Sequence, residues 1–299
     1  MKKAFFIVLY ITGLTTFARW YYRKRVVFLC YHGVTQRPSR STEDPKGLHV
    51  NHLRFNQHLE FLRSHYHVIS LSDYIAAQRD GRSLPHYSVV LTFDDGFRNF
   101  LTVAAPLLAQ YALPATVFLV TDRAQKTVSL DLPEEWTPED DAKHLSWSEA
   151  QWLRDKQNVE FGSHTCSHSE LLTLSLQNAR RELLHSYNEL LSNLGVKTAI
   201  LAYPKGQYSR VIANEARKVG YAGAVTTDRG RNEVDHDPFT LGRTLIGDDD
   251  DLASFAVRVS GIRWWLAGIR SLLMPRAKPV SYKPGGILPP VAGRYEVHQ

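Results

Sequence analysis

Short apolar runs alternate with amphipathic stretches along most of the chain, and this alternation restricts the folds that it can adopt. The strand-like apolar runs lie at 26–31, 89–93, 115–120, 159–161 and 199–203. Helical periodicity follows at 53–65, 97–111, 148–156, 174–194 and 209–219. Buried strands that alternate with helices predict a mainly parallel sheet, either open or closed into a barrel. In both forms the chemistry is expected where the carboxyl ends of the strands meet loops.

The composition narrows the class of protein further. The chain has 299 residues, 43% of them hydrophobic, which supports a sizeable core and excludes a disordered or fibrous chain. The net charge of +6 is small and dispersed, so we expect no nucleic-acid partner. Two cysteines, Cys30 and Cys166, are too few for a disulfide scaffold or a Cys-rich zinc module. We expect both to be buried as small apolar side chains.

The two ends of the chain carry features of membrane contact. An apolar run at 4–18 follows two lysines and precedes an aromatic and basic collar at 20–25, which predicts a signal anchor or a cleaved signal peptide. A buried core helix is the third interpretation of this segment, 1–25. At 256–299 we expect an amphipathic helix, on a membrane interface or packed on the domain, and a Pro/Gly-rich tail. The catalytic domain is expected at 26–255.

Two of the apolar runs end in polar side chains that suit hydrolytic chemistry. The first leads into Asp94, Asp95 and Gly96, and the glycine ends the strand so that both carboxylates can serve one site. Another leads into His164 and His168, whose i, i+4 spacing places both rings on one face of a helical turn. Each pattern alone is also an ordinary turn or loop. Together, at the ends of separate strands, they favour a metal centre.

The candidate ligands suggest which metal and which reaction. Two neutral imidazoles and one carboxylate leave open positions for water, as in a catalytic zinc centre. A cation there lowers the pKa of bound water, and a second carboxylate can accept the proton as the water attacks. The same ligands bind non-haem Fe(II) in oxygenases, where the second carboxylate would have no role. We expect a divalent metal, with Zn preferred and Co, Ni or Fe as alternatives.

The chain resembles the polysaccharide deacetylase family, which is carbohydrate esterase family 4 with the NodB homology fold, in two motifs. These read T-F-D-D-G at 92–96 and H-T-C-S-H at 164–168, and the similarity extends over roughly residues 26 to 250. The resemblance implies an α/β fold, a distorted (β/α) barrel, and metal-dependent removal of acetyl groups from sugars. It also implies that Asp94 is the catalytic base and that Asp95, His164 and His168 are the metal ligands.

Further segments resemble one branch of that family, the poly-N-acetylglucosamine deacetylases, in which the barrel is circularly permuted. Tyr203 and Pro204 stand where the third motif is expected, so Pro204 would wall the groove and the Tyr203 backbone amide would donate to the oxyanion. The usual late histidine strand is missing. The early run at 26–31 ends in His32 instead, which we assign as the general acid, with a histidine that caps a strand as the alternative.

Three other features have weaker roles. Arg243 is expected to orient Asp94 or to form a structural ion pair. Trp147 is expected to wall a sugar site or simply to follow the N-cap of a helix at Ser146. The polar stretch 121–144 has no clear periodicity and is a candidate lid or substrate-contact loop.

The sequence therefore predicts a metal-dependent hydrolase that removes N-acetyl groups from a cell-surface or exported polysaccharide or oligosaccharide. We expect it in a bacterial-type cell envelope, at a membrane surface or in the periplasmic or extracellular space. One alternative is a non-catalytic, membrane-associated carbohydrate-binding or assembly factor on the same fold. Another is a deacylase of a lipid-linked sugar. The sequence leaves protein partners open.

Overall fold

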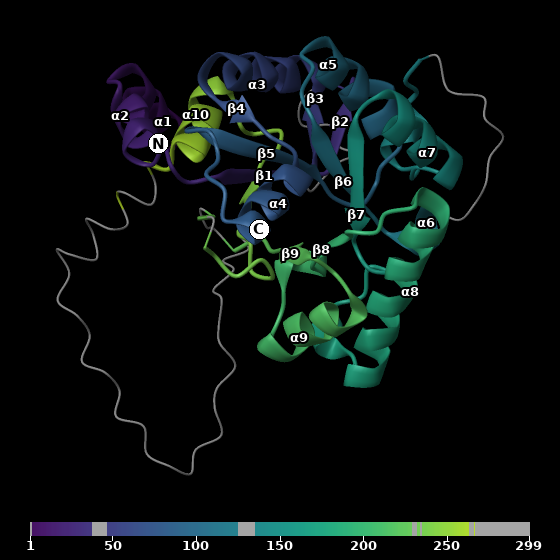
Figure 1. Ribbon diagram of the computed structural model, residues 1–299. Coiled ribbons are helices and arrows are strands. Elements are labelled where there is room, and N and C mark those ends of the chain that lie inside the picture. The colour runs from purple at the N-terminus through teal and green to yellow at the C-terminus, as the bar shows by residue number, and fades with distance from the viewer. Residues whose placement is uncertain are drawn as a thin grey trace. The chain divides into compact units, whose positions relative to one another are not determined.

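A parallel sheet forms the centre of the fold (Figure 1). The computed structural model describes residues 2–37, 47–124, 135–228, 232–233, 235–262 and 266. The strand order is β10-β1-β5-β6-β7-β8-β9, with β4 also beside β5, and each of these pairs is parallel. The strands are β1 Val27–Tyr31, β4 His67–Val68, β5 Ser88–Phe93, β6 Ala115–Leu119, β7 Val159–Ser163, β8 Ile200–Ala202, β9 Gly223–Val225 and β10 Thr244–Leu245.

The segment from Leu241 to Leu245 joins the two edges of this sheet. Leu241 forms a parallel bridge with Val225 of β9, and β10 then pairs with β1 at Leu29 and Cys30. The sheet therefore curls into the distorted (β/α) barrel that the sequence predicts. Although β1 is its first strand in sequence, it lies between β5 and β10. A second, two-stranded parallel sheet joins β2 (Gly33–Thr35) to β3 (His49–Asn51).

Helices connect the strands, and most begin at a side-chain cap. The caps are Asn51, Ser70, Ser146, Ser175, Ser209 and Asp251, each of which accepts a backbone N–H in the first turn. The helices are α3 His52–His65, α4 Leu71–Asp80, α5 Ala105–Gln110, α6 Thr121–Ala124, α7 Trp147–Lys156, α8 Leu176–Leu194, α9 Arg210–Val219 and α10 Leu252–Ser260. A π-helical turn, Phe100–Ala104, precedes α5, and 3-10 turns lie at Pro138–Asp141, Leu171–Thr173 and Pro204–Gly206. The sequence pattern missed α4 and α6 and the short strands β2, β3, β4, β9 and β10.

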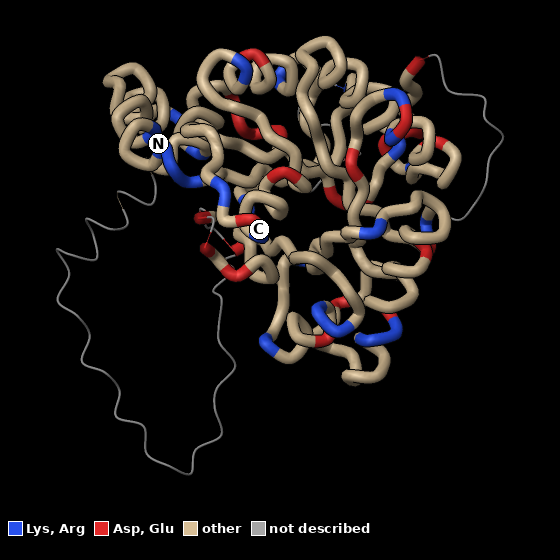
Figure 2. The backbone as a smooth tube through the Cα atoms, viewed as in Figure 1, with Lys and Arg blue, Asp and Glu red and all other residues tan. Residues whose placement is uncertain are grey.

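Both faces of the sheet are buried, because alternate side chains of each strand enter different apolar clusters. One cluster contains Leu29, Leu91 and Val117 together with residues of α3, α5 and α8. The other contains Phe28 and Val90 with residues of α4. A parallel sheet covered on both faces leaves its strand ends as the place for polar chemistry. Basic and acidic residues are interspersed along the chain (Figure 2), as the small net charge implies.

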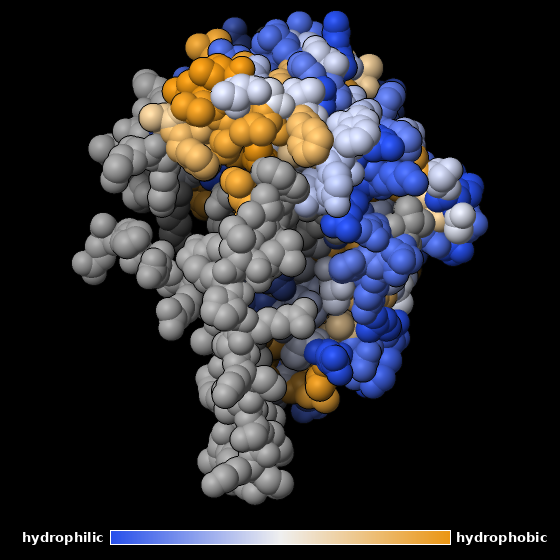
Figure 3. All heavy atoms as spheres, turned by 90° about the vertical axis from the view of Figure 1, so that its left-hand side faces the viewer, coloured by the Kyte–Doolittle hydropathy of each residue, from blue (hydrophilic) through white to orange (hydrophobic). Residues whose placement is uncertain are grey.

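The N-terminal apolar run forms two helices, α1 (Lys2–Ile11) and α2 (Leu14–Tyr21), which are bent by 73° at the break between them. Both pack against α10. Much of their apolar surface remains exposed (Figure 3), at Phe5, Ile7, Val8, Ile11, Leu14, Phe17 and Trp20. Among the described residues no single helix has the length and composition to cross a bilayer, whereas the bent pair has both. The run is therefore not a buried core helix.

The helix α10 crosses the domain boundary that we expected at residue 255. Its residues Phe255, Val257 and Val259 are buried, so the domain continues through the end of α10. The chain divides into compact units at 1–263 and 264–299. Apart from α10, Gly261, Ile262 and Leu266, the amphipathic helix and tail expected at 256–299 lie outside the described residues. In the expected loop at 121–144, residues 125–134 likewise lie outside them.

Candidate active site

Two consecutive left-handed residues end β5 and bring both carboxylates to the same edge of the sheet. Asp95 and Gly96 each have a φ of 67°, and a Cβ at Gly96 would lie 2.6 Å from the Leu119 side chain. The Asp94 N–H continues the sheet ladder by donating to the Tyr31 carbonyl at 2.9 Å. The strand thus ends just before the two acids, beside the glycine that the sequence predicts to end it.

The two histidines follow β7, the second strand along from β5 in the sheet. The His164 N–H donates to the Leu119 carbonyl at 2.7 Å, which fixes the start of the loop beside β6. Thr165 and His168 have φ values of 66° and 65°, so the segment is an irregular loop, and the expected helical turn is wrong. The rings nevertheless meet, with centroids 4.7 Å apart.

Asp95, His164 and His168 form a cluster that fits a divalent cation. Asp95 Oδ1 lies 3.8 Å from His164 Nε2 and 3.5 Å from His168 Nε2, and the three candidate ligand atoms all lie within 4.8 Å of one another. That oxygen is buried and has no hydrogen-bond partner among the described residues. His164 Nδ1–H donates to the Ala202 carbonyl at 2.8 Å, which leaves Nε2 free to bind a metal. Burial and the nearby His164 lower the pKa of His168, which favours the neutral imidazole that a metal ligand requires.

Asp94 and Arg243 form a fully buried, bidentate ion pair beside this cluster. The guanidinium Nη1 and Nη2 lie 2.6 Å and 2.7 Å from the two carboxylate oxygens. Burial alone would raise the pKa of Asp94, but Arg243 and then His164 outweigh it and hold that pKa well below its usual range. Arg243 comes from the segment that closes the barrel, and it also donates to Thr92 Oγ1 and to the Thr226 carbonyl.

His32 follows β1 at the same edge of the sheet. Burial lowers the pKa of its imidazole, and the negative charges of Asp94 and Asp95 oppose this effect. These electrostatic partners show that His32 lies in the neighbourhood of the two carboxylates. The structure therefore brings together His32, Asp94, Asp95, His164 and His168, which the sequence had given in three separate segments.

In the third motif, the backbone amide that was expected to serve the oxyanion is engaged in the sheet. The Tyr203 N–H donates to the Val225 carbonyl of β9 at 3.1 Å, so it is not available for an oxyanion, and that assignment is wrong. Pro204 is buried at the start of the following turn, in which Lys205 has a left-handed φ of 56°. Within the described part of the chain, the Lys205 N–H has no acceptor.

Trp147 lies at the start of α7, behind a capping box made by Ser146 and Glu149. The residue is 8% exposed and packs in the larger apolar cluster, which leaves little of the side chain for stacking on a sugar. A histidine that the sequence did not single out, His144, lies within electrostatic reach of Asp95 and His168. Burial, Arg123 and His168 lower its pKa to about 4, whereas Asp95 opposes the shift. Its only sequence signal is its place just before that helix.

The two cysteines have different surroundings. Cys30 is buried, as expected, and donates a weak hydrogen bond to Asp94 Oδ2 at 3.4 Å. Cys166 is only partly buried and contacts Asp122 and His185, so the expectation of a small apolar side chain is wrong for it.

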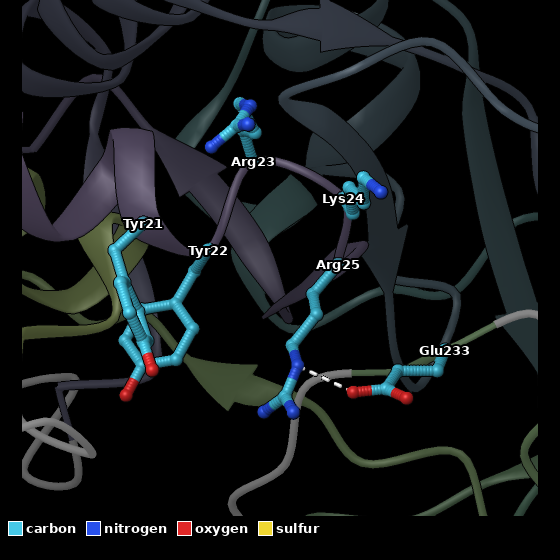
Figure 4. Close-up of a pocket in the computed structure, with 6 residues that line it drawn as sticks. All are labelled: Tyr21, Tyr22, Arg23, Lys24, Arg25 and Glu233. Atoms are coloured by element: carbon cyan, nitrogen blue, oxygen red, sulfur yellow. Dashed lines mark ion pairs between the residues drawn. The ribbon is translucent and has the colours of Figure 1, made fainter.

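A cavity lies apart from these residues, at the amino ends of β1 and β5. It measures about 550 Å³ and is lined by Tyr21, Tyr22, Arg23, Lys24, Arg25 and Glu233. Figure 4 shows the two tyrosine rings side by side and the ion pair between Arg25 and Glu233. Because the strands are parallel, this basic cavity lies at the amino ends of the strands, whereas the carboxylate–histidine cluster lies at their carboxyl ends.

Comparison with known proteins agrees with the geometry. The family model described as polysaccharide deacetylase matches residues 81–224. The chain is 23% identical over 240 residues to YxkH of Bacillus subtilis, which is described as a putative polysaccharide deacetylase. This alignment covers 80% of this chain and 77% of YxkH. It is 24% identical over 264 residues to the poly-β-1,6-N-acetyl-D-glucosamine N-deacetylase of Escherichia coli, but this spans only 38% of the E. coli protein.

A solved structure shares the fold. The Streptococcus pyogenes deacetylase PplD, in complex with acetate, aligns with a TM-score of 0.68 at 23% identity, covering 79% of this chain and 98% of that one. The matched region of the family model contains both the acidic and the histidine motif. The chain is therefore similar to the polysaccharide deacetylase family over the region that holds both motifs.

Proposed function

We propose that this protein is a metal-dependent N-deacetylase that acts on an acetylated polysaccharide. One observation carries the proposal: a carboxylate fixed by a buried arginine, Asp94 with Arg243, lies beside a separate cluster of three metal-ligand side chains. A metal centre that only bound a sugar would have no need of this second, permanently ionised carboxylate.

The side chains divide the reaction between them. Asp95, His164 and His168 would hold a divalent cation, which would supply a Lewis acid and lower the pKa of a water molecule. Asp94 accepts the proton as the water oxygen attacks the acetamide carbon, and Arg243 keeps that carboxylate ionised and oriented. His32 gives a proton to the nitrogen as the C–N bond breaks, and acetate and a free amine result. Since the Tyr203 amide is engaged in the sheet, we assign the donor to the oxyanion to the Lys205 N–H.

The substrate class is an N-acetylated hexosamine polymer. The E. coli relative and relatives from Staphylococcus aureus are named for poly-β-1,6-N-acetyl-D-glucosamine, so this polymer is the first candidate. The activity of the whole E. coli protein does not transfer with the name, because the chain corresponds to 38% of its length.

Acetate release from a panel of acetylated glycans tests the activity. The panel contains poly-β-1,6-N-acetyl-D-glucosamine, chitin oligosaccharides, an O-acetylated glycan and a lipid-linked N-acetylglucosamine. We expect release from an N-acetylated polymer that stops on chelation and in Asp94→Asn, while Asp94→Asn still binds metal. Release that survives chelation, or glycan binding with no release under any metal, would overturn the proposal, and the latter result would favour a non-catalytic binding factor.

We place the enzyme at a membrane surface of the cell envelope. The exposed apolar side chains of α1 and α2 and the basic residues Arg23, Lys24 and Arg25 support this location, since such a pair suits the acyl and headgroup layers. Flotation of the full chain with phosphatidylglycerol vesicles tests it, and Phe5→Ser with Phe17→Ser should reduce binding. Equal flotation of the wild type and this variant would contradict the placement.

A further inference from the structure

A second set of metal-ligand side chains lies next to the histidine loop. Cys166 Sγ is 3.0 Å from Asp122 Oδ1 and 3.1 Å from His185 Nδ1, and the three candidate ligand atoms all lie within 4.8 Å of one another. Asp122 belongs to α6 and His185 to α8, which are neighbours in the fold (Figure 1). Three elements thus direct a carboxylate, a thiol and an imidazole at one point.

The surroundings of these side chains suit a cation. The other ring nitrogen of His185, Nε2, lies 3.9 Å from Glu189 Oε1. This is beyond hydrogen-bond distance, but it places a carboxylate near the ring nitrogen at which metal-binding histidines usually have one. Glu182 adds a further negative charge on the same helix, where it accepts from the Ser167 N–H and hydroxyl. Asp122 and His185 are exposed and Cys166 is partly buried, so an ion and a water ligand can enter from solvent.

The backbone holds the three ligands together independently of any ion. The Thr121 and Asp122 N–H groups donate to the Thr165 and Cys166 carbonyls at 3.2 Å and 3.0 Å, which joins α6 to the loop. Tetrahedral zinc with one sulfur and one nitrogen or oxygen ligand separates those atoms by about 3.5 Å. The side chains therefore need to open by only about half an ångström, which rotation of exposed Asp122 and His185 allows.

We propose that Asp122, Cys166 and His185 bind a second zinc ion, distinct from the ion at Asp95, His164 and His168. A thiolate with an imidazole favours zinc over the hard cations magnesium and calcium, and three protein ligands leave the fourth position to water. On binding, the Cys166 thiol releases its proton to solvent and the sulfur bonds to the metal. The ion ties α6 and α8 to the loop that carries His164 and His168, so it supports the catalytic ligands from behind.

Cobalt substitution separates the two ions, because only the proposed site contains sulfur. The full chain is stripped with chelator and reloaded with Co²⁺ or Zn²⁺, and metal content is measured by mass spectrometry. We expect two metals per chain and a near-ultraviolet sulfur-to-cobalt absorption band. Cys166→Ser and His185→Gln should each lower the content to one, and Cys166→Ser should abolish the band. Asp95→Asn should also lower the content to one but keep the band.

Two matched variants complete the test. Ser167→Ala changes the neighbour of Cys166 without removing a ligand, and Cys30→Ser removes the other sulfur; both should keep the band and the second metal. Circular dichroism establishes that each variant is folded. One metal per chain in the wild type at saturating zinc, or a band that persists in Cys166→Ser, would overturn the proposal and leave a thiol that only hydrogen-bonds Asp122 and His185.

Discussion

Replacement of Arg243 by Met tests how the buried ion pair at the base is stabilised. The Arg243 side chain is fully buried, that of Asp94 is 4% exposed, and two short hydrogen bonds join them. Met fills much of the volume of the arginine stem but supplies no charge and no donor. The change therefore leaves a carboxylate buried without its cation, and removal of one partner from such a pair costs about 3 to 5 kcal/mol.

The matching double variant separates pairing from simple loss of packing. Asp94→Asn alone leaves the guanidinium unpaired at a similar cost, whereas Asp94→Asn with Arg243→Met removes both charges. We expect the unfolding free energy of the double variant to exceed, by about 2 kcal/mol or more, the value that the sum of the two single effects predicts. Urea unfolding followed by tryptophan fluorescence measures each free energy. Arg79→Met, which breaks an exposed pair with Asp80, is the control and should leave the midpoint unchanged.

The pH dependence of the Arg243→Met variant has a definite sign. Without the guanidinium, burial dominates and the Asp94 pKa rises above its ordinary value of about 3.9. The folded variant then binds a proton before the unfolded chain does, so its deficit against the wild type should shrink as the pH falls from about 7 to about 4. A deficit below about 1 kcal/mol at neutral pH, or single effects that add within about 0.5 kcal/mol, would refute the reasoning.

Three other changes test separate parts of the structure. Asp95→Asn should lower acetate release to below about 1% of wild type and abolish metal binding at the catalytic cluster, because loss of a direct ligand exceeds the 10- to 100-fold effect of outer partners; retained metal there would contradict the ligand assignment. Burial lowers the pKa of His58 to about 4, against about 6.5 in the unfolded chain. The unfolded chain therefore binds the proton first, and the unfolding free energy should fall by up to about 3 kcal/mol as the pH is lowered from about 6.5 to about 4. His58→Gln should flatten that slope in urea titrations, and an unchanged slope would count against it. Gly206→Ala places a Cβ 2.4 Å from the Thr227 nitrogen, so it should lower the melting temperature clearly more than Gly195→Ala does. Gly195 has a similar left-handed φ but open space around it, and equal melting temperatures of the two variants would contradict this argument.

The fold class and the acidic and histidine motifs could be predicted from the sequence, because strand-like apolar runs that end in those residues are local features. Contacts made by strands that are too short to recognise could not be predicted. The engagement of the Tyr203 amide depends on β9, a three-residue strand that no periodicity reveals. The pairing of Arg243 with Asp94 likewise depends on the closure of the barrel by Leu241 and β10, so the sequence left it as one of two interpretations.

The backbone conformation of the histidine loop was also beyond the pattern. An i, i+4 spacing predicts a helical face, but left-handed φ values at Thr165 and His168 bring the rings together by another path. Side chains that approach from other elements, such as His144 and His185, have no motif of their own. They become candidates only once α7 and α8 are placed beside the loop.

The pairing of Arg243 with Asp94 has a consequence for biosynthesis. The two residues are 149 positions apart, and the arginine arrives on a segment that is among the last parts of the domain to be made. A nascent chain that ends before residue 243 has both acids and both histidines but lacks the cation that keeps Asp94 ionised in a buried setting. On the proposed mechanism, deacetylation therefore begins only after Arg243 has been made and has paired with Asp94, so the appearance of activity would mark the closure of the barrel.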